Sequence, residues 1–397
     1  NIFGQLRDQP LRLDGPIRMK MLEHAWPRVS STGFKADWAG NSVVLDGGLQ
    51  EQWSAGVSLD LMNAGALVPG LQGRIQGHMA LTGSERTPDI MLDLSATEGA
   101  YAGYALKSAR LEAVIPEFGD AHSDISLQII GATNERGLAL GNLSFAAKGV
   151  VRDHQLELAL EGAPLSMTAQ LAGSLDPQTG NWEGTWQVGQ ASLGEMQWQL
   201  SAPVNLAWLN LPRELRVDGH CWQSMPASFC ATEPVVVGPN GRVVLHLKDF
   251  ETLRLATFMP EGLSWLAAVE GNVTAEWRQG QAPVAHALLR TGSGEVRLAK
   301  DEGEPLSLRY DQLSVALQAD ASAVSSTVTL ASADLGNARL DATINPFAEG
   351  RPVTGEVALS GLRLELLQPF LPGLSQLTGL VSADGRLDGS LARPRYW

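Results

Sequence analysis

The chain has 397 residues, with 43 acidic and 29 basic side chains and a formal net charge of -14. This acidic balance argues against nucleic-acid binding, in which a basic face supplies most of the affinity. The sequence contains no apolar run of about 18 residues or more, so no transmembrane helix is predicted.

Alternation of apolar and polar residues with a period of two dominates the chain from one end to the other. This period places Leu, Val and Ile on one face of a sheet and polar residues on the other. The 42 Gly and 21 Pro residues punctuate the chain, so we expect successive antiparallel strands separated by turns. The alternating stretches, in chain order, are 57–61, 89–94, 109–115, 124–130, 154–162, 167–173, 242–250, 312–320, 327–335 and 338–344.

Three stretches depart from simple alternation and are similar to one another: 59–71, 253–263 and 362–374. Each has Leu-x-Leu, a short apolar stretch, then Pro, Gly and Leu, which predicts a short amphipathic helix between strands. Residues 73–88 also align without gaps on 379–394, each ending in Gly-Ser-x-x-x-Pro. Gly permits a positive φ at the turn, and Pro is tolerated at a strand start.

Such internal similarity is typical of an elongated repeat architecture. We therefore expect residues 1–397 to form one continuous repeat array, itself a piece of a longer polypeptide. Its helix-containing units are predicted near 57–115, 249–299 and 357–397. The helix at 362–374 is expected to cover the apolar sheet face with Leu364, Leu367, Phe370 and Leu371.

These repeats, together with the Cys221-Trp222…Cys230 hairpin, resemble the TamB family of the AsmA-like group. The resemblance covers essentially the whole chain, as a central portion of a longer protein, and the family is similar to bridge-like lipid-transfer proteins. It implies an all-β fold in which an elongated antiparallel sheet curls into an open, β-taco-like trough. It also implies a periplasmic location within an inner-membrane-anchored, envelope-spanning protein. Two contacts would lie outside this chain: an amino-terminal anchor in the inner membrane and a BamA-like outer-membrane barrel of the TamA type.

The sequence offers little that could carry catalysis. The seven histidines are scattered, and neither a phosphate-binding Gly-x-x-x-x-Gly-Lys loop nor a Gly-x-Ser-x-Gly elbow occurs. His220 beside Cys221 does not supply the four clustered ligands of a structural zinc site. We therefore predict no enzyme, no metal and no cofactor. Trp182, Trp186 and Trp198 either line an acyl-chain path or its rim, or pack in an ordinary core.

The two cysteines lie nine positions apart in "CWQSMPASFC". A hairpin about Met225-Pro226 places Cys221 opposite Cys230, at a spacing that a disulfide can bridge. Because Pro226 is incompatible with the positive φ of the usual two-residue turns, we expect a looser loop of four or more residues. A disulfide indicates an oxidising compartment, which for this family is the periplasm; the alternative is two reduced cytosolic thiols.

The first functional hypothesis is a conduit that carries phospholipid between the inner and outer membranes, with acyl chains held in a hydrophobic groove. The second is a scaffold that assists assembly of outer-membrane β-barrel proteins and autotransporters with a barrel partner. The third is a closed β-solenoid that serves as a structural or adhesin segment. The residues predicted to line the groove are Leu92, Leu94, Leu111, Leu127, Leu158, Leu160, Leu171, Val243, Leu245, Leu247, Val315, Leu317, Val328, Leu330 and Leu340.

Overall fold

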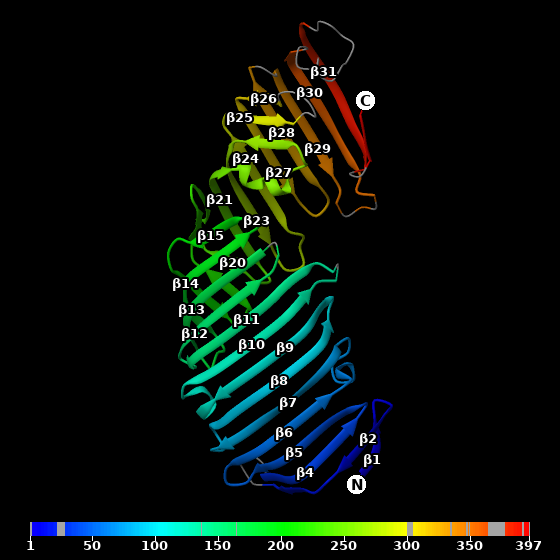
Figure 1. The fold of residues 1–397 in the computed structure, drawn as a ribbon, viewed down its shortest axis with the longest axis vertical. Coiled ribbons are helices and arrows are strands. Elements are labelled where there is room, and N and C mark those ends of the chain that lie inside the picture. The colour runs from blue at the N-terminus through cyan, green and yellow to red at the C-terminus, as the bar shows by residue number, and fades with distance from the viewer. Residues whose placement is uncertain are drawn as a thin grey trace. The chain divides into compact units, whose positions relative to one another are not determined.

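The computed structural model describes residues 2–21, 28–135, 137–163, 165–299, 305–333, 336–346, 348, 350–363, 378–390 and 393–396. Most of these residues lie in β-strands, which pair antiparallel (Figure 1). The chain divides into two compact units, Asn1–Gln197 and Trp198–Trp397, and each is described by itself. Within the described part of the chain, no helix has the length and hydropathy that a bilayer crossing requires.

The first unit is a sheet in which the strands from β4 to β14 pair with their neighbours in chain order. β1 pairs with β2, and both β2 and β3 pair with β4. The division between the units falls within β15 (Met196–Leu200). The strands of the first unit are β1 (Ile2–Leu6), β2 (Gln9–Asp14), β3 (Ile17–Lys20), β4 (Arg28–Trp38), β5 (Asn41–Leu49), β6 (Trp53–Leu61), β7 (Gln72–Gly83), β8 (Pro88–Tyr101), β9 (Tyr104–Ile115), β10 (Ser123–Thr133), β11 (Ala139–Val150), β12 (Asp153–Glu161), β13 (Leu165–Leu175) and β14 (Trp182–Leu193).

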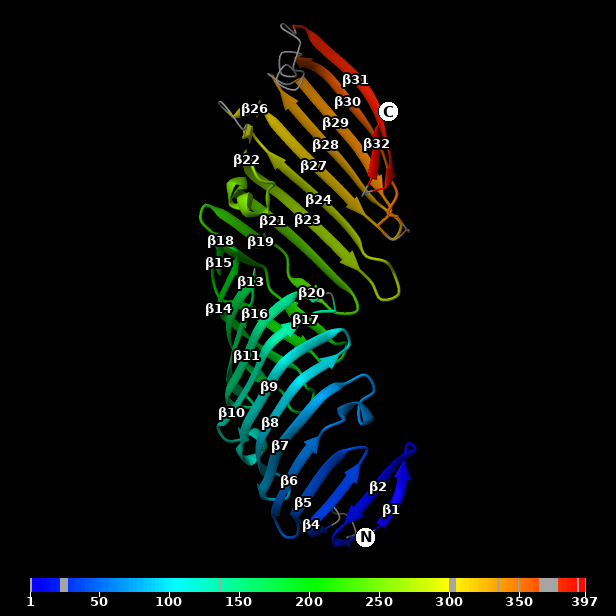
Figure 2. The same ribbon diagram turned by 45° about the vertical axis from the view of Figure 1, so that its right-hand side comes forward.

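The second unit continues the same style of pairing through β21, β23, β24 and β27 to β32 (Figure 2). Two ladders of short strands lead to β21, one through β15, β18 and β19 and the other through β16, β17 and β20. A separate small sheet has the order β22-β25-β26. The strands are β16 (Val204–Leu209), β17 (Glu214–Val217), β18 (His220–Ser224), β19 (Ala227–Ala231), β20 (Val235–Val237), β21 (Gly241–Glu251), β22 (Leu263–Leu266), β23 (Ala268–Trp277), β24 (Val284–Thr291), β25 (Gly294–Leu298), β26 (Leu306–Tyr310), β27 (Gln312–Ala319), β28 (Val324–Ser332), β29 (Gly336–Ile344), β30 (Val353–Arg363), β31 (Leu380–Ser390) and β32 (Arg393–Tyr396).

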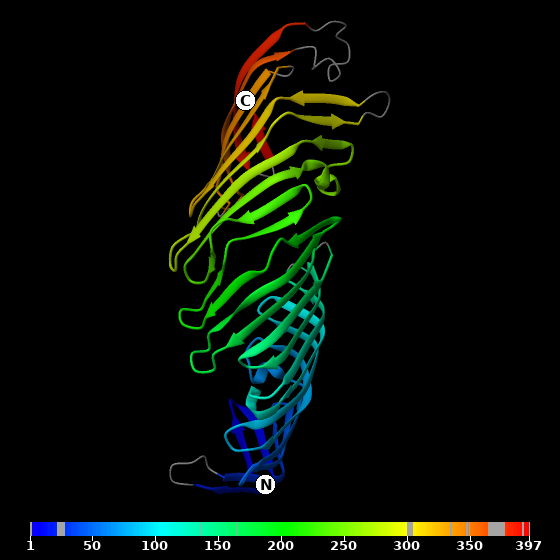
Figure 3. The same ribbon diagram turned by 90° about the vertical axis from the view of Figure 1, so that its left-hand side faces the viewer.

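The predicted all-β class is confirmed, and every alternating stretch quoted above overlaps a strand. The sheet of each unit is curled, as Figure 3 shows, and its described strands do not close into a barrel. The short helical segments are 3-10 turns: η1 (Ala64–Ala66) in the first repeat and η3 (Thr252–Phe258) in the middle one. A further turn, η2 (Pro116–Gly119), contains two residues of positive φ. The helix expected at 362–374 falls almost wholly on residues 364–377, outside the described residues.

The Gly and Pro positions of the two aligned Gly-Ser-x-x-x-Pro segments pair in the same way. Gly83 has a φ of +88° and lies opposite Pro88, which begins β8. Gly389 has a φ of +112° and lies opposite Pro394 in β32. The sequence repeat therefore corresponds to a structural repeat, in which glycine supplies the left-handed conformation that other residues disfavour.

Few large side chains are buried in the described part of the chain. Of the described side chains that are less than 2% exposed, the largest is Thr252. The buried apolar residues are mostly small: Ala55, Ala64, Ala113, Ala169, Ala227 and Ala231, with Val204, Val217, Val244, Val269 and Val353, and a few larger ones, Leu49, Met196, Leu206 and Tyr310. Backbone ladders therefore organise each unit, and much of the leucine surface stays partly open to solvent.

Candidate functional site

The first unit carries an apolar face formed by one side of its sheet. Leu94 lies opposite Leu111, and Leu111 lies opposite Leu127. Phe145 links Leu127 to Leu158, because it lies opposite both. Since directly opposed residues share a face and the side-chain period is two, the register extends this face to the other predicted positions. All seven predicted residues of this unit lie on it: Leu92, Leu94, Leu111, Leu127, Leu158, Leu160 and Leu171.

The second unit carries an apolar face of the same kind. Leu317 and Val315 of β27 lie opposite Ala287 and Leu289 of β24. These two residues in turn lie opposite residues of β23 that pair with β21. Val328 lies opposite both Val315 and Leu340. All eight predicted residues of this unit share that face: Val243, Leu245, Leu247, Val315, Leu317, Val328, Leu330 and Leu340.

The exposure of these side chains distinguishes the two faces from an ordinary core. None of the fifteen predicted residues is buried. Leu158 and Leu317 are each 37% exposed, and the others are half-buried. Each of these two leucines lies opposite an alanine, Ala169 and Ala287 respectively, and Ala169 is only 7% exposed. The two leucines therefore present hydrocarbon to the solvent, and the alanine beside Leu158 is covered.

Charged side chains gather on the opposite, polar face. In the first unit Arg110 bonds Asp93 at 3.0 Å and Glu112 at 2.8 Å. Arg74 donates two hydrogen bonds to Asp60, at 2.9 and 2.8 Å, and thereby lowers the pKa of that carboxyl. These groups are well exposed, so each pair adds little to stability. The pairs therefore keep the charged groups on the polar face, and the opposite face carries the apolar side chains.

The polar face of the second unit has the same character. Arg339 bonds Asp341 at 2.6 and 2.9 Å, and Thr327 donates to the same carboxylate at 2.6 Å. These bonds lower the pKa of Asp341. A shallow hollow of about 790 Å³ lies here, lined mainly by polar side chains that include Thr327, Asp341, Glu356 and Arg386. It is not an apolar pocket and differs in chemistry from the predicted groove.

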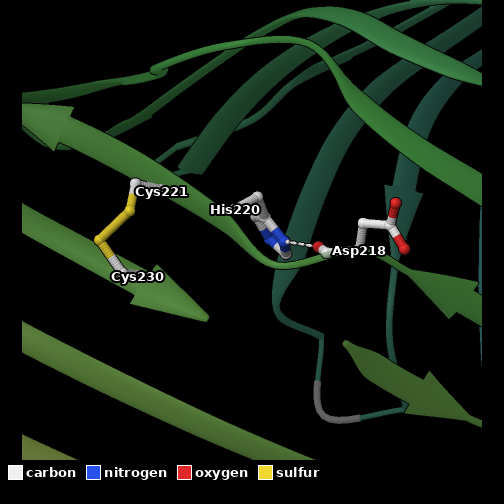
Figure 4. Close-up of a disulfide and its surroundings, with 4 residues drawn as sticks. All are labelled: Asp218, His220, Cys221 and Cys230. Atoms are coloured by element: carbon white, nitrogen blue, oxygen red, sulfur yellow. Dashed lines mark hydrogen bonds between the residues drawn. A yellow bond between two sulfur atoms is a disulfide. The ribbon is translucent and has the colours of Figure 1, made fainter. Parts of the chain in front are cut away.

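The disulfide between Cys221 and Cys230 is present, with the two Cα atoms 4.0 Å apart (Figure 4). The register is the one predicted, with Trp222 opposite Phe229. Phe229 in turn lies opposite Leu247, whereas Cys230 lies opposite His246. The disulfide therefore clips the hairpin from the polar side and leaves its aromatic pair on the apolar face.

The predicted loose loop in this hairpin is wrong. Ser224 lies directly opposite Ala227, so Met225 and Pro226 alone form the turn. The Met225–Pro226 peptide is cis, an arrangement in which proline occupies the third position of a tight turn without a positive φ. Sequence reasoning also missed how the turn is held: Arg254 of η3 donates to Ser224 Oγ at 2.6 Å and to the Met225 carbonyl at 2.5 Å.

The histidines and acidic residues of the described part of the chain do not form a metal-ligand cluster. The described residues contain no group of three or more His, Cys, Asp or Glu side chains able to hold a metal ion. His220, considered above beside Cys221, has its Nδ1 atom 2.8 Å from the Asp218 carbonyl (Figure 4). Trp182 and Trp186 of β14 are half-buried on the apolar face, and Trp198 stacks on Phe250 with ring centroids 6.4 Å apart.

The comparisons with known proteins cover nearly the whole chain. The family described as "TamB, N-terminal domain" matches residues 1–396. The Haemophilus influenzae protein named "Translocation and assembly module subunit TamB" is 21% identical over 398 residues, which cover 99% of this chain. This chain spans 30% of the length of that relative. No solved structure matches the chain.

Proposed function

Because the chain belongs to the TamB family, we propose that it is a periplasmic segment of an envelope-spanning conduit for phospholipid. The relative's name describes a translocation and assembly module, and this chain corresponds to 30% of that protein. The inner-membrane anchor and the outer-membrane barrel partner of such a module are part of the proposal, and both lie outside the residues described above. Within the conduit, the apolar face of each unit lines a hydrophobic groove.

One observation carries this proposal: the register gathers all fifteen predicted residues on one face per unit, and none of them is buried. A closed solenoid fills its interior with its own side chains, which would bury these leucines. An open apolar face instead leaves room for the hydrocarbon of another molecule. Exposed hydrocarbon of this extent is typical of a binding surface rather than of an unused one.

The energetics fit lipid as the occupant. A sixteen-carbon acyl chain costs on the order of 12 kcal/mol to expose to water, at about 0.8 kcal/mol per CH₂ group. A row of Leu and Val side chains removes most of this penalty, and the polar headgroup can remain hydrated. Because the row repeats from strand to strand, no single position holds the lipid much more tightly than the next. Movement along such a surface requires no catalytic residue.

The test places a photo-crosslinking amino acid at Leu158 or at Leu317, the two most exposed of the predicted residues. The matched controls are Glu157 and Gln318, which directly adjoin them in sequence and lie on the polar face. After irradiation in cells, mass spectrometry identifies what is attached. We expect phospholipid on residues 158 and 317 but not on 157 and 318. Equal labelling of both pairs contradicts the conduit, and nascent barrel protein in place of lipid favours the assembly scaffold.

A further inference from the structure

The two ends of the strands in the first unit differ in chemistry. One end, where β6 and β14 begin, carries Trp53 and Trp182 on the apolar face, and we call it the tryptophan rim. The other end, where β6, β8 and β14 finish, we call the open rim. Its turns and strand ends expose apolar side chains, each at least 37% exposed: Met62, Leu67, Val68, Tyr101, Tyr104, Leu138, Leu165 and Leu193. Between β6 and β14, the described residues at the tryptophan rim expose two comparable side chains, Phe118 in the turn after β9 and Val114 next to the end of β9.

Trp182 is fixed at its rim by both its ring and its nitrogen. A Cβ atom added at Gly173 or at Gly184 would lie 2.3 or 2.5 Å from the indole, so the ring lies across the neighbouring backbone. The indole N–H donates to His154 Nε2 at 2.8 Å. His154 Nδ1 faces the carbonyls of Val150 and Val151 at 3.2 and 3.1 Å, so Nδ1 carries the proton and Nε2 accepts.

Trp53 is oriented in the same sense. Its N–H donates to the Glu85 carbonyl at 3.3 Å, in the turn between β7 and β8. The Glu85 side chain pairs with Arg28 at 3.2 Å, which places charges next to the indole. In both cases the polar atom of the indole is engaged at the rim, and its hydrocarbon adjoins the apolar face.

The second unit has a similar tryptophan at the end of a strand of its own sheet. Trp277, the last residue of β23, lies opposite Gly241, where an added Cβ would come within 2.0 Å of the ring. Its N–H donates to the Gly238 carbonyl at 2.9 Å, in the turn between β20 and β21. Cross-strand glycine thus again permits an indole to lie flat at the end of an apolar face.

From this asymmetry we infer that a diacyl lipid on the first unit lies in one orientation, with its ester and headgroup region at the tryptophan rim. The inference rests on the proposed function. Indoles with an engaged N–H and a hydrocarbon body suit the boundary between ester groups and acyl chains. The acyl ends extend toward the open rim, where the exposed Leu, Met and Val side chains offer hydrocarbon contact. The reversed orientation would set the polar ester groups against those side chains.

The experiment uses two phosphatidylethanolamine photoprobes in vesicles, one with a diazirine on the headgroup and one with a diazirine at the acyl terminus. Labelled peptides are mapped by mass spectrometry. The headgroup probe should label the turns at 84–87 and 176–181 more strongly than the peptide 101–104. The acyl probe should label the peptide 101–104 more strongly than those two turns. A preference of roughly tenfold for each probe is expected if reversal is disfavoured as argued.

Variants separate orientation from stability. Trp182→Ala should reduce the preference of the headgroup probe for residues 176–181, and Trp182→Phe should retain part of it. The matched control is Val188→Ala, on the same strand but on the polar face, which should leave the ratio unchanged; melting curves report folding in each case. Equal labelling of both rims by each probe overturns the orientation and leaves the conduit intact. Absence of label from the apolar face with both probes overturns the conduit itself.

Discussion

Replacing Leu158 by aspartate tests whether the apolar face is open. Burying a leucine side chain fully contributes about 1.5–3 kcal/mol. Leu158 is 37% exposed, so about three-fifths of this contribution, roughly 1–2 kcal/mol, is lost in Leu158→Asp. The new carboxylate can stay hydrated, because the side chain it replaces already reaches solvent. Leu158→Asp should therefore fold. Its carboxylate would place one charge on the otherwise uncharged path proposed for acyl chains.

Leu49 provides the matched control, because it is the same residue type at 3% exposure, in the same unit. Leu49→Asp buries an unpaired carboxylate, which costs several kcal/mol and should unfold the unit or cause its degradation. The assay is urea denaturation of both variants, followed by lipid crosslinking of the one that folds. We expect Leu158→Asp to remain folded and to lose crosslinked lipid. Destabilisation of Leu158→Asp equal to that of Leu49→Asp would refute the open face and favour a closed interior.

Three further predictions concern stability. Alkylation of the native protein without reductant should modify neither Cys221 nor Cys230, and replacing both by serine should cost roughly 2–3 kcal/mol in unfolding free energy; two alkylated thiols would contradict the clip. Hydrogen bonds from Arg297 and Ser307 lower the pKa of Glu295 from its ordinary 4.5 to about 2, so their stabilising effect is complete above pH 4.5 and lost as the pH falls toward 2. The melting temperature of Glu295→Gln should accordingly depend less on pH in that window, and an unchanged slope would show that the carboxylate is not paired in solution. Gly83→Ala should lower the unfolding free energy by about 1–2 kcal/mol because the φ of +88° is unfavourable for alanine; an unchanged urea midpoint would show that the turn adjusts.

The faces were predictable from the sequence because period two is a local property of strands. Leu92 and Leu94 are two residues apart in β8, so alternation alone places both side chains on the same face of the sheet. β14 shows where such reasoning ends: Gln170 lies opposite Val188, but Leu171 lies opposite Trp186. The bulge shifts parity within the strand, and it depends on pairing between strands rather than on either sequence alone.

The hairpin between β18 and β19 shows a second limit. The pairing of Cys221 with Cys230 followed from symmetry about the turn, whereas the tight form of that turn did not. Contacts from outside the hairpin hold this turn. Here the partner is Arg254, which lies 30 residues from Ser224 and bonds the turn directly. No pattern within the hairpin itself indicates that residue.

Small residues explain how each sheet can be stable and yet leave its leucines available. Ala113 and Ala169 are 4% and 7% exposed, and they lie opposite Leu92 and Leu158. A large side chain beside a small one shields the backbone ladder from water, while its outer surface stays open. The stability of the sheet then depends on its backbone hydrogen bonds and on the side chains that shield them. It does not require that the space above the apolar face be filled. In the proposed conduit, that space is free of the packing demands of a core, so an acyl chain would occupy it without displacing any part of the fold.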